Sequence, residues 1–184
     1  MQPIPVVKIT PINPEVEKYH KLWKDVPQYR NFAPGEGAVQ QFLAAVRPKT
    51  GATAYDFGAG TGRGAVTLAL LGRMNVRMTD FVGDVCLDPE VREMLTTQAQ
   101  ALSFQTLDLT RPFPEGMEVR DYGVCTDVLE HIQPERVEAA IRNMLSVAKA
   151  CFFQIALVDD AFGAAIGAKL HLTVRPAQWW LDLI

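Results

Sequence analysis

The stretch "AYDFGAGTGRG", residues 54–64, places four glycines at every second position behind an aspartate. Glycine adds no side-chain packing and loses much conformational entropy on folding, so this spacing indicates a special task for the backbone. An apolar run over 53–57 precedes the glycines, and a helical pattern over 61–71 follows them. The stretch therefore predicts a strand-to-helix turn whose N–H groups face a ligand.

Short apolar runs alternate with helical patterns on both sides of this turn. The pattern predicts strands over 53–57, 76–81, 102–107, 122–127 and 151–158, and helices over 61–71, over 89–98, from Pro134 and from Pro176. Such alternation is typical of βαβ units, so we predict an α/β fold with a parallel sheet. For the helix from Pro134, the predicted sheet-facing stripe is Val137, Ile141, Leu145 and Ala148.

The N-terminal third precedes this pattern. Residues 1–14 carry four prolines and predict an extended arm, since proline fixes φ and lacks an N–H donor. Helices are expected over 15–24 and 36–47. We predict a single domain of residues 1–184, with the arm, a helical cap over 15–47 and a core over 53–184.

Composition narrows the function classes. The chain has 184 residues, 48% of them hydrophobic, and a net charge of −3, so it has no basic field and nucleic acid is not favoured as a partner. Cys86, Cys125 and Cys151 show no CxxC or Cys/His spacing, so we expect reduced thiols and no metal site. With no membrane-span pattern and no signal pattern, a cytoplasmic protein is predicted.

The glycine stretch does not fit the dinucleotide fingerprint, because Arg63 stands at the sixth position counted from Gly58. From Asp56 to Gly64 it resembles motif I of class I S-adenosylmethionine-dependent methyltransferases, as in small uncharacterised bacterial and phage members. The resemblance extends over about 53–160. It implies S-adenosyl-L-methionine as cofactor and a Rossmann-like, doubly wound, mainly parallel sheet of order 3-2-1-4-5 with helices on both faces. The family's usual sixth and seventh strands have no clear candidates here.

The resemblance also implies a cofactor site along the glycine loop and the strand ends. Asp56 would reach the amino group of the cofactor, Asp80 the ribose hydroxyls and Asp108 the adenine amine. The complete predicted set is Asp56, Gly58, Ala59, Gly60, Gly62, Asp80, Phe81, Asp108, Leu109, Thr126, Asp127 and Arg30. Alternatives stay open: the glycines could form only a tight turn, Asp84 or Asp88 could replace Asp80, and Asp108 could only cap a turn.

Methyl transfer is an in-line displacement, so the protein mainly positions the acceptor, excludes water and sometimes removes a proton. Glu130 and His131 in "CTDVLEHIQ" resemble a signature of small-molecule methyltransferases. His131 and His171 are the predicted general bases, although both could be structural. Trp23, Tyr29 and Phe32 could cover the cofactor, and the acceptor is expected to be a small molecule.

The strand edge and the activity each allow more than one interpretation. The apolar edge of the strand over 151–158 needs cover, which a homodimer partner, residues 170–184 or a C-terminal segment lost by truncation could supply. The function could also be that of a cofactor-binding regulatory or partner module without catalysis. An NAD-dependent oxidoreductase is disfavoured by Arg63 and by the lack of a second mononucleotide half.

Overall fold

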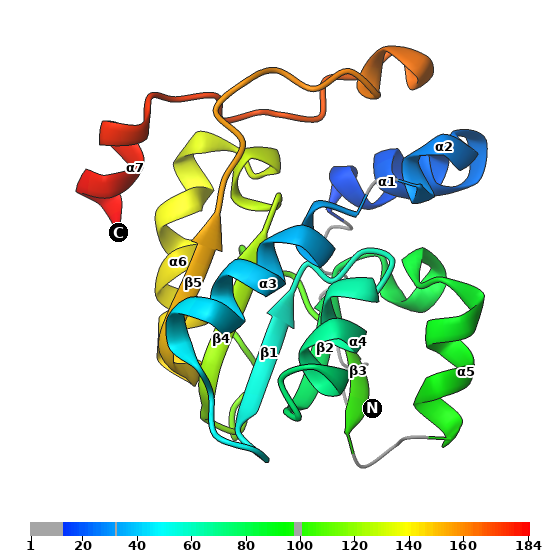
Figure 1. The fold of residues 1–184 in the computed structure, drawn as a ribbon. Coiled ribbons are helices and arrows are strands. Elements are labelled where there is room, and N and C mark those ends of the chain that lie inside the picture. Colours follow the sequence, from blue (N-terminus) through cyan, green and yellow to red (C-terminus); the bar gives the residue numbers. More distant parts are fainter. Residues whose placement is uncertain (1–12, 32, 98–100) are drawn as a thin grey trace, which may run out of the picture.

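The computed structural model describes residues 13–31, 33–97 and 101–184, and most of the predicted arm lies outside these ranges. Its centre is a five-stranded, all-parallel sheet in the order β3-β2-β1-β4-β5 (Figure 1), which confirms the predicted order. The strands are β1 (Thr53–Phe57), β2 (Asn75–Asp80), β3 (Leu102–Thr106), β4 (Arg120–Thr126) and β5 (Ala148–Gln154). No strand follows β5 within residues 155–184.

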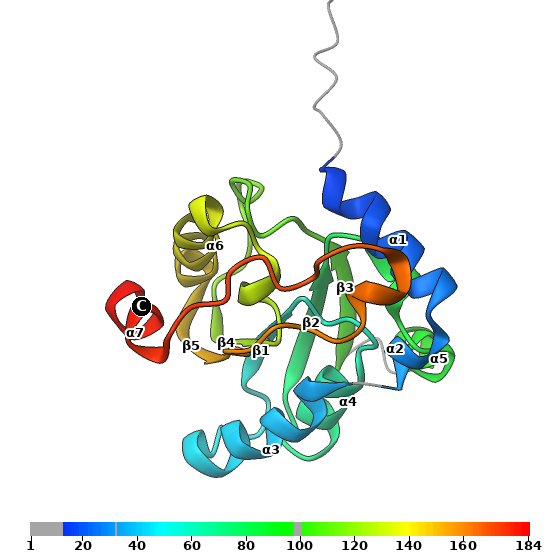
Figure 2. The ribbon, with the colours of Figure 1, turned by 90° about the horizontal axis from the view of Figure 1, so that it is seen from above.

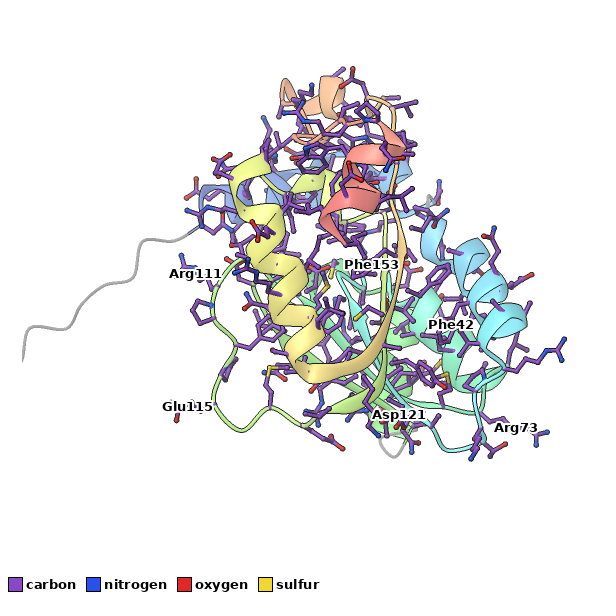
Figure 3. All side chains as sticks on the ribbon, turned by 90° about the vertical axis from the view of Figure 1, so that its left-hand side faces the viewer. Phe42, Arg73, Arg111, Glu115, Asp121 and Phe153 are labelled. Atoms are coloured by element: carbon purple, nitrogen blue, oxygen red, sulfur yellow. The ribbon has the colours of Figure 1, made fainter. Side chains whose placement is uncertain are left out.

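Helices cover both faces of the sheet, as a doubly wound fold requires. On one face lie α3 (Pro34–Val46), α4 (Arg63–Leu70) and α5 (Pro89–Thr97), and on the other α6 (Pro134–Val147) and α7 (Ala177–Leu183). Phe42 and Phe153 belong to the two separate core clusters, and Figure 3 shows them on opposite sides of the sheet.

The buried stripe of α6 differs from the predicted one. Leu145 is 44% exposed, and Ala148 already belongs to β5. The buried positions are Val137, Ala140, Ile141, Met144 and Val147. The predicted stripe took two successive steps of four up to Leu145, which drifts around a helix of 3.6 residues per turn, whereas alternating steps of three and four keep to one face.

The carboxyl ends of the strands are covered by α1 (Pro14–Asp25), α2 (Pro27–Arg30) and the segment 155–174 (Figure 2). Leu22 of α1 is fully buried in a cluster that includes Val82 after β2 and Leu170 of the covering segment. The cap predicted over 15–47 thus divides in two, because α3 packs on the face of the sheet while α1 and α2 cross the strand ends.

The C-terminal helix covers apolar surface beside β5. Trp180 is 3% exposed and joins the cluster that α6 forms with Phe153 and Cys151. This is one of the three predicted ways to cover the edge, and the homodimer stays a prediction. Among the described residues, none of the helices combines the length and the hydrophobicity needed to span a membrane.

Candidate functional site

A cavity of about 750 Å³ lies at the carboxyl ends of the strands, between the sheet and the covering helices. It sits where the chain order reverses between β1 and β4, which is the usual ligand position in open α/β sheets. Its volume suits a small ligand. Ten of the predicted cofactor residues line it: Asp56, Gly58, Ala59, Gly60, Asp80, Phe81, Asp108, Leu109, Thr126 and Asp127.

The glycine loop forms one wall because its backbone takes conformations that other residues avoid. Gly58 and Gly60 have φ values of +72° and +51°. The N–H groups of Gly58 and Ala59 both donate to the Thr79 carbonyl at 2.9 Å, which ties the loop to β2. A Cβ at position 58 would lie 2.4 Å from a methyl group of Val128. Glycine is therefore required at position 58 by conformation and by space.

Gly62 serves the fold from outside the cavity. It has φ +80°, and a Cβ there would lie 2.7 Å from Val91 Cγ1 and 3.0 Å from the Met78 sulfur. Gly62 thus lets the start of α4 pack closely against α5 and β2. We leave it out of the proposed site.

Arg30 also lies outside the cavity, because its guanidinium is engaged elsewhere. It donates to the carbonyl oxygens of Cys86 and Val85 at 2.9 Å each, and it stacks on the ring of Trp23. A bidentate contact with a ligand carboxylate would compete with these bonds. We therefore leave Arg30 out of the proposed site as well.

Asp80 is the acid that faces the cavity at the end of β2. It is 8% exposed, and its two carboxylate oxygens accept the N–H groups of Val82 and Gly60 at 3.1 Å each. Burial raises its pKa, and these bonds oppose that shift. The Cys86 thiol and the Phe81 N–H also lower its pKa by hydrogen bonding, and the carboxylate lines the cavity where a ligand donor could reach it. Asp84 is exposed and Asp88 pairs with Arg63 at 3.4 Å, which leaves Asp80 as the ligand candidate.

Asp56 lies deeper, with 5% of its surface exposed. Burial, together with repulsion from Asp80, raises the pKa of Asp56 to about 7, and the Ala65 N–H partly offsets this shift. A cation bound in the cavity would favour the ionised form of Asp56, and the ionised carboxylate would in turn strengthen the binding of that cation.

Asp108 caps the turn after β3 and also lines the cavity. One oxygen accepts the backbone N–H and the hydroxyl of Thr110 at 2.9 and 2.7 Å, which caps the turn after β3. The other accepts from Asn13 Nδ2 at 3.1 Å. These bonds lower the pKa of Asp108 against the opposing effect of burial. The side chain still lines the cavity beside Leu109, and its contact with adenine stays a prediction.

The end of β4 is held in an unusual backbone conformation. Asp127 has φ +58°, in the left-handed region that few residues other than glycine occupy, and its N–H donates to the Gln154 carbonyl at 2.9 Å. Such strain gathers at functional sites. Next to it, a Cβ on Gly35 would come within 2.8 Å of Thr126 Oγ1, so glycine lets α3 approach the site.

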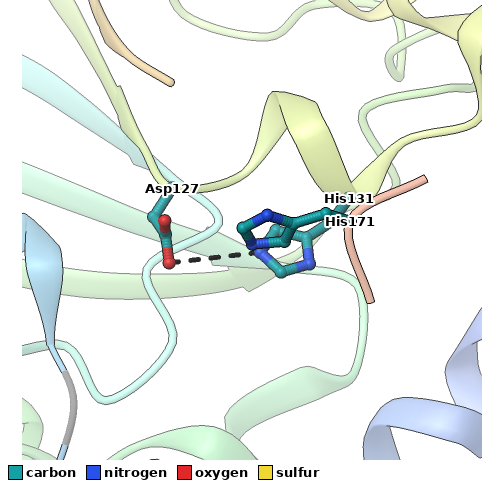
Figure 4. A group of neighbouring side chains, drawn as sticks. All are labelled: Asp127, His131 and His171. Carbon is teal, nitrogen blue, oxygen red and sulfur yellow. Dashed lines mark ion pairs between the residues drawn. The ribbon is translucent and has the colours of Figure 1, made fainter. Parts of the chain in front are cut away.

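The two predicted bases, His131 and His171, lie together although they are distant in sequence. Their ring centroids are 4.6 Å apart, and the ring planes are nearly perpendicular. His131 Nε2 is 4.0 Å from a carboxylate oxygen of Asp127 (Figure 4). His131 and Asp127 line the cavity. His171 joins them from the segment that follows β5.

Two further residues shape this site. Tyr19, which the sequence analysis missed, lines the cavity and places its hydroxyl 2.6 Å from His131 Nδ1. Glu130 is fully buried, accepts the N–H of Ala156 and has its pKa raised to about 8 by burial. This hydrogen bond fixes the start of the covering segment.

Tyr19 could not be found from the sequence, because an aromatic residue on a predicted helix gives no sign that it contacts a ligand. The predicted covers Trp23 and Tyr29 also line the cavity, while Phe32 lies outside the described residues.

The cavity is rich in acids. The carboxylates that line it among the described residues are Glu15, Glu36, Asp56, Asp80, Asp108 and Asp127, against the guanidiniums of Arg111 and Arg136. Lys18, Arg63 and Arg111 pair with Glu15, Glu36 and Asp108, which leaves Asp56, Asp80 and Asp127 as the acids that set the charge of the inner wall. The field in the cavity therefore favours a cationic ligand over an anionic one.

No protein-family model and no curated protein sequence matches this chain. Among solved structures, an O-methyltransferase family protein from Burkholderia thailandensis has a TM-score of 0.60 at 14% identity, covering 89% of this chain and 55% of its own. A 1,6-didemethyltoxoflavin-N1-methyltransferase from the same organism, with bound 1,6-didemethyltoxoflavin and S-adenosylhomocysteine, has a TM-score of 0.60 at 16% identity, covering 77% and 62%. The chain has the fold of class I methyltransferases.

The same comparison finds a protein from Rhodobacter sphaeroides described as belonging to the Zn-dependent alcohol dehydrogenases. Its TM-score is 0.59 at 22% identity, and the alignment covers 79% of this chain and 55% of that protein. At these identities the likeness concerns the fold, which methyltransferases and nucleotide-dependent dehydrogenases both build from βαβ units. The chain spans between 55% and 62% of the lengths of these three neighbours. The residues of the cavity, and not the fold, distinguish the possible activities.

Proposed function

We propose that the chain is an S-adenosylmethionine-dependent methyltransferase that acts on a small-molecule acceptor. The observation that carries this proposal is the position of the glycine loop and the Asp80 carboxylate on the walls of one acid-lined cavity. A methyltransferase neighbour of the same fold was crystallised with S-adenosylhomocysteine and a small-molecule ligand.

The residues on these walls fit the cofactor group by group. The glycine loop would receive the methionine end, and Asp56 would offset its ammonium charge. Asp80, a carboxylate on the cavity wall at the end of β2, would accept from the ribose hydroxyls. Phe81 and Leu109 would flank the adenine ring. When bound, S-adenosylmethionine supplies the electrophilic methyl group.

The remaining walls would hold the acceptor. Tyr19, Trp23 and Tyr29 line the side of the cavity under the covering helices, where they would exclude water from the methyl group. His131 and Asp127 form the wall at the end of β4. These polar groups would orient the acceptor atom and receive its proton where the transfer requires proton removal.

The oxidoreductase alternative fits this cavity poorly. A dinucleotide brings a pyrophosphate with two negative charges, and the lining carboxylates would repel it. Arg63 is held by Asp88 and does not line the cavity. The fold is shared with a dehydrogenase neighbour, so the charge of the cavity is the feature that separates the two functions.

Calorimetric titration tests the cofactor assignment. S-adenosylhomocysteine and S-adenosylmethionine are expected to bind, and NAD⁺ is expected to show no heat at millimolar concentration. A chain that binds NAD⁺ and neither sulfur compound would refute the proposal. A screen of metabolites and nucleic acids with methyl-labelled cofactor then tests transfer, and tight binding without labelling of any pool would favour a module without catalysis.

A further inference from the structure

Asp127, His131 and His171 bring one carboxylate and two imidazoles together at the end of β4. The atoms that each could offer a metal ion all lie within 4.8 Å of one another. Figure 4 shows the Asp127 carboxylate facing the paired rings. Asp127 and His131 belong to the cavity wall, so a ligand in the cavity would have access to this cluster.

In both histidines the outer ring nitrogen, Nδ1, is already engaged by a hydrogen bond, which leaves the inner one, Nε2, for a ligand. His171 Nδ1 lies 2.6 Å from the Val158 carbonyl. Since a carbonyl only accepts, Nδ1 carries the proton and Nε2 keeps its lone pair. His131 Nδ1 lies 2.6 Å from the Tyr19 hydroxyl. A hydrogen bond at the outer nitrogen is the usual arrangement of histidines that bind metal ions.

The inner nitrogen of His131 lacks a partner in the part of the chain that the structure describes. The His131 side chain is only 10% exposed, and the nearest acid, Asp127, is 4.0 Å from this nitrogen. A buried polar atom without a partner destabilises the fold. A ligand between the three side chains would supply the missing partner.

We propose that Asp127, His131 and His171 form a binding site for a divalent transition-metal ion, with Zn²⁺ as the ion that this set suits. Two imidazoles and one carboxylate with a further position open are ligands that Zn²⁺ takes in catalytic sites. Mg²⁺ prefers oxygen ligands and is disfavoured. Bonds near 2.0–2.1 Å would bring the donor atoms to about 3.4 Å from one another. The cluster must close slightly, and Asp127, whose side chain is 22% exposed, has room to move.

The open position of the ion would face the cavity. An acceptor bound there through a hydroxyl oxygen would have the pKa of that hydroxyl lowered, as metal-bound water does. His131 and His171 would then act on the acceptor through the ion instead of as free bases. This role in methyl transfer rests on the proposed function, whereas binding of the ion does not.

Cobalt(II) titration of the untagged chain, without cofactor, tests the site. Co²⁺ replaces Zn²⁺ in such sites and gives visible ligand-field bands. We expect saturable bands that Zn²⁺ abolishes and millimolar Mg²⁺ leaves unchanged. In His131→Gln and His171→Gln the affinity should fall by more than the 10- to 100-fold typical of losing an outer partner, whereas Tyr19→Phe should fall within that range.

Two controls keep the test decisive. His20, the remaining histidine of the chain, is exposed, so His20→Gln should bind Co²⁺ as the wild type does. Asp127→Asn removes the carboxylate and keeps a residue that tolerates the left-handed backbone, so it should fold, by circular dichroism, and bind more than 10-fold more weakly. The proposal is overturned by absent bands, by bands unchanged in the folded Asp127→Asn variant, or by an intense near-ultraviolet cobalt–thiolate band that assigns the ion to cysteine. Because no cofactor is present, such a failure leaves the cofactor assignment intact.

Discussion

Replacing Asp80 with asparagine tests the cofactor site most directly. Both oxygens of Asp80 already accept backbone N–H groups, from Val82 and Gly60 at 3.1 Å each. The amide of Asp80→Asn would turn an NH₂ group toward one of these donors and would keep one acceptor oxygen without charge. The ribose hydroxyls would thus lose charge-assisted hydrogen bonds, each worth about 1.5–3 kcal/mol.

We expect a net loss of about 2–3 kcal/mol, which corresponds to roughly 30- to 150-fold weaker binding of S-adenosylhomocysteine. Calorimetry at constant pH measures this loss, and circular dichroism reports whether the variant is folded. Asp84→Asn is the matched control, because Asp84 carries the same charge nearby and is exposed. Its affinity should stay within about twofold of the wild type.

A second readout separates the cofactor site from a general loss of structure. Asp80 contributes to the raised pKa of Asp56 by repulsion. In folded Asp80→Asn, carbon NMR of the carboxyl groups should therefore show a lower pKa for Asp56. Wild-type affinity in Asp80→Asn, or an equal loss in Asp84→Asn, would refute the assignment of Asp80 as the ribose ligand.

Three other perturbations test the fold around the site. The pKa of Asp56 is raised from 3.8 to about 7, so the folded state keeps this proton at pH values where the unfolded chain has lost it. The contribution of Asp56 to stability, roughly 4 kcal/mol at most, is therefore lost as the pH rises from about 4 through 7. Thermal unfolding of Asp56→Asn across pH 5–8 should show a flatter stability profile than the wild type. Gly58→Ala combines a positive φ with a 2.4 Å approach of its Cβ to Val128, whereas Gly51→Ala has φ +81° and free space around its Cβ. Chemical denaturation should show a loss of unfolding free energy of about 1–2 kcal/mol for Gly51→Ala and a larger loss for Gly58→Ala. Equal losses would exclude a steric contribution from Val128. Trp180→Ala should lower the free energy of unfolding by about 3–5 kcal/mol, since Trp180 is 3% exposed. Leu181→Ala is the control, because Leu181 is 69% exposed and its loss should be nearly neutral. A small effect of Trp180→Ala would show that α7 adds little to the core.

The periodicity of the sequence was sufficient to find the strands and their fold class. β1 occupies the predicted range 53–57, and the helix from Pro134 begins where proline suits the first turn. The limits of β5 were less accurate. α6 passes directly into β5 at Ala148, which pairs with Arg120, and β5 ends at Gln154, opposite Thr126 at the end of β4. Pairing with β4 decides where β5 begins and ends, and a continuous apolar run in the sequence does not show where this pairing stops.

The sequence by itself determined the sheet and the glycine loop, because strand periodicity and the conformations open to glycine are properties of short segments. The tertiary structure alone decided which polar groups meet. It engaged Arg30 with carbonyl oxygens far along the chain, used Gly62 for helix packing, and joined His171 to His131 and Asp127. Such meetings depend on the order of strands in the sheet and on the path of the covering segment, and the physical reason is that side chains compete for partners across the whole fold.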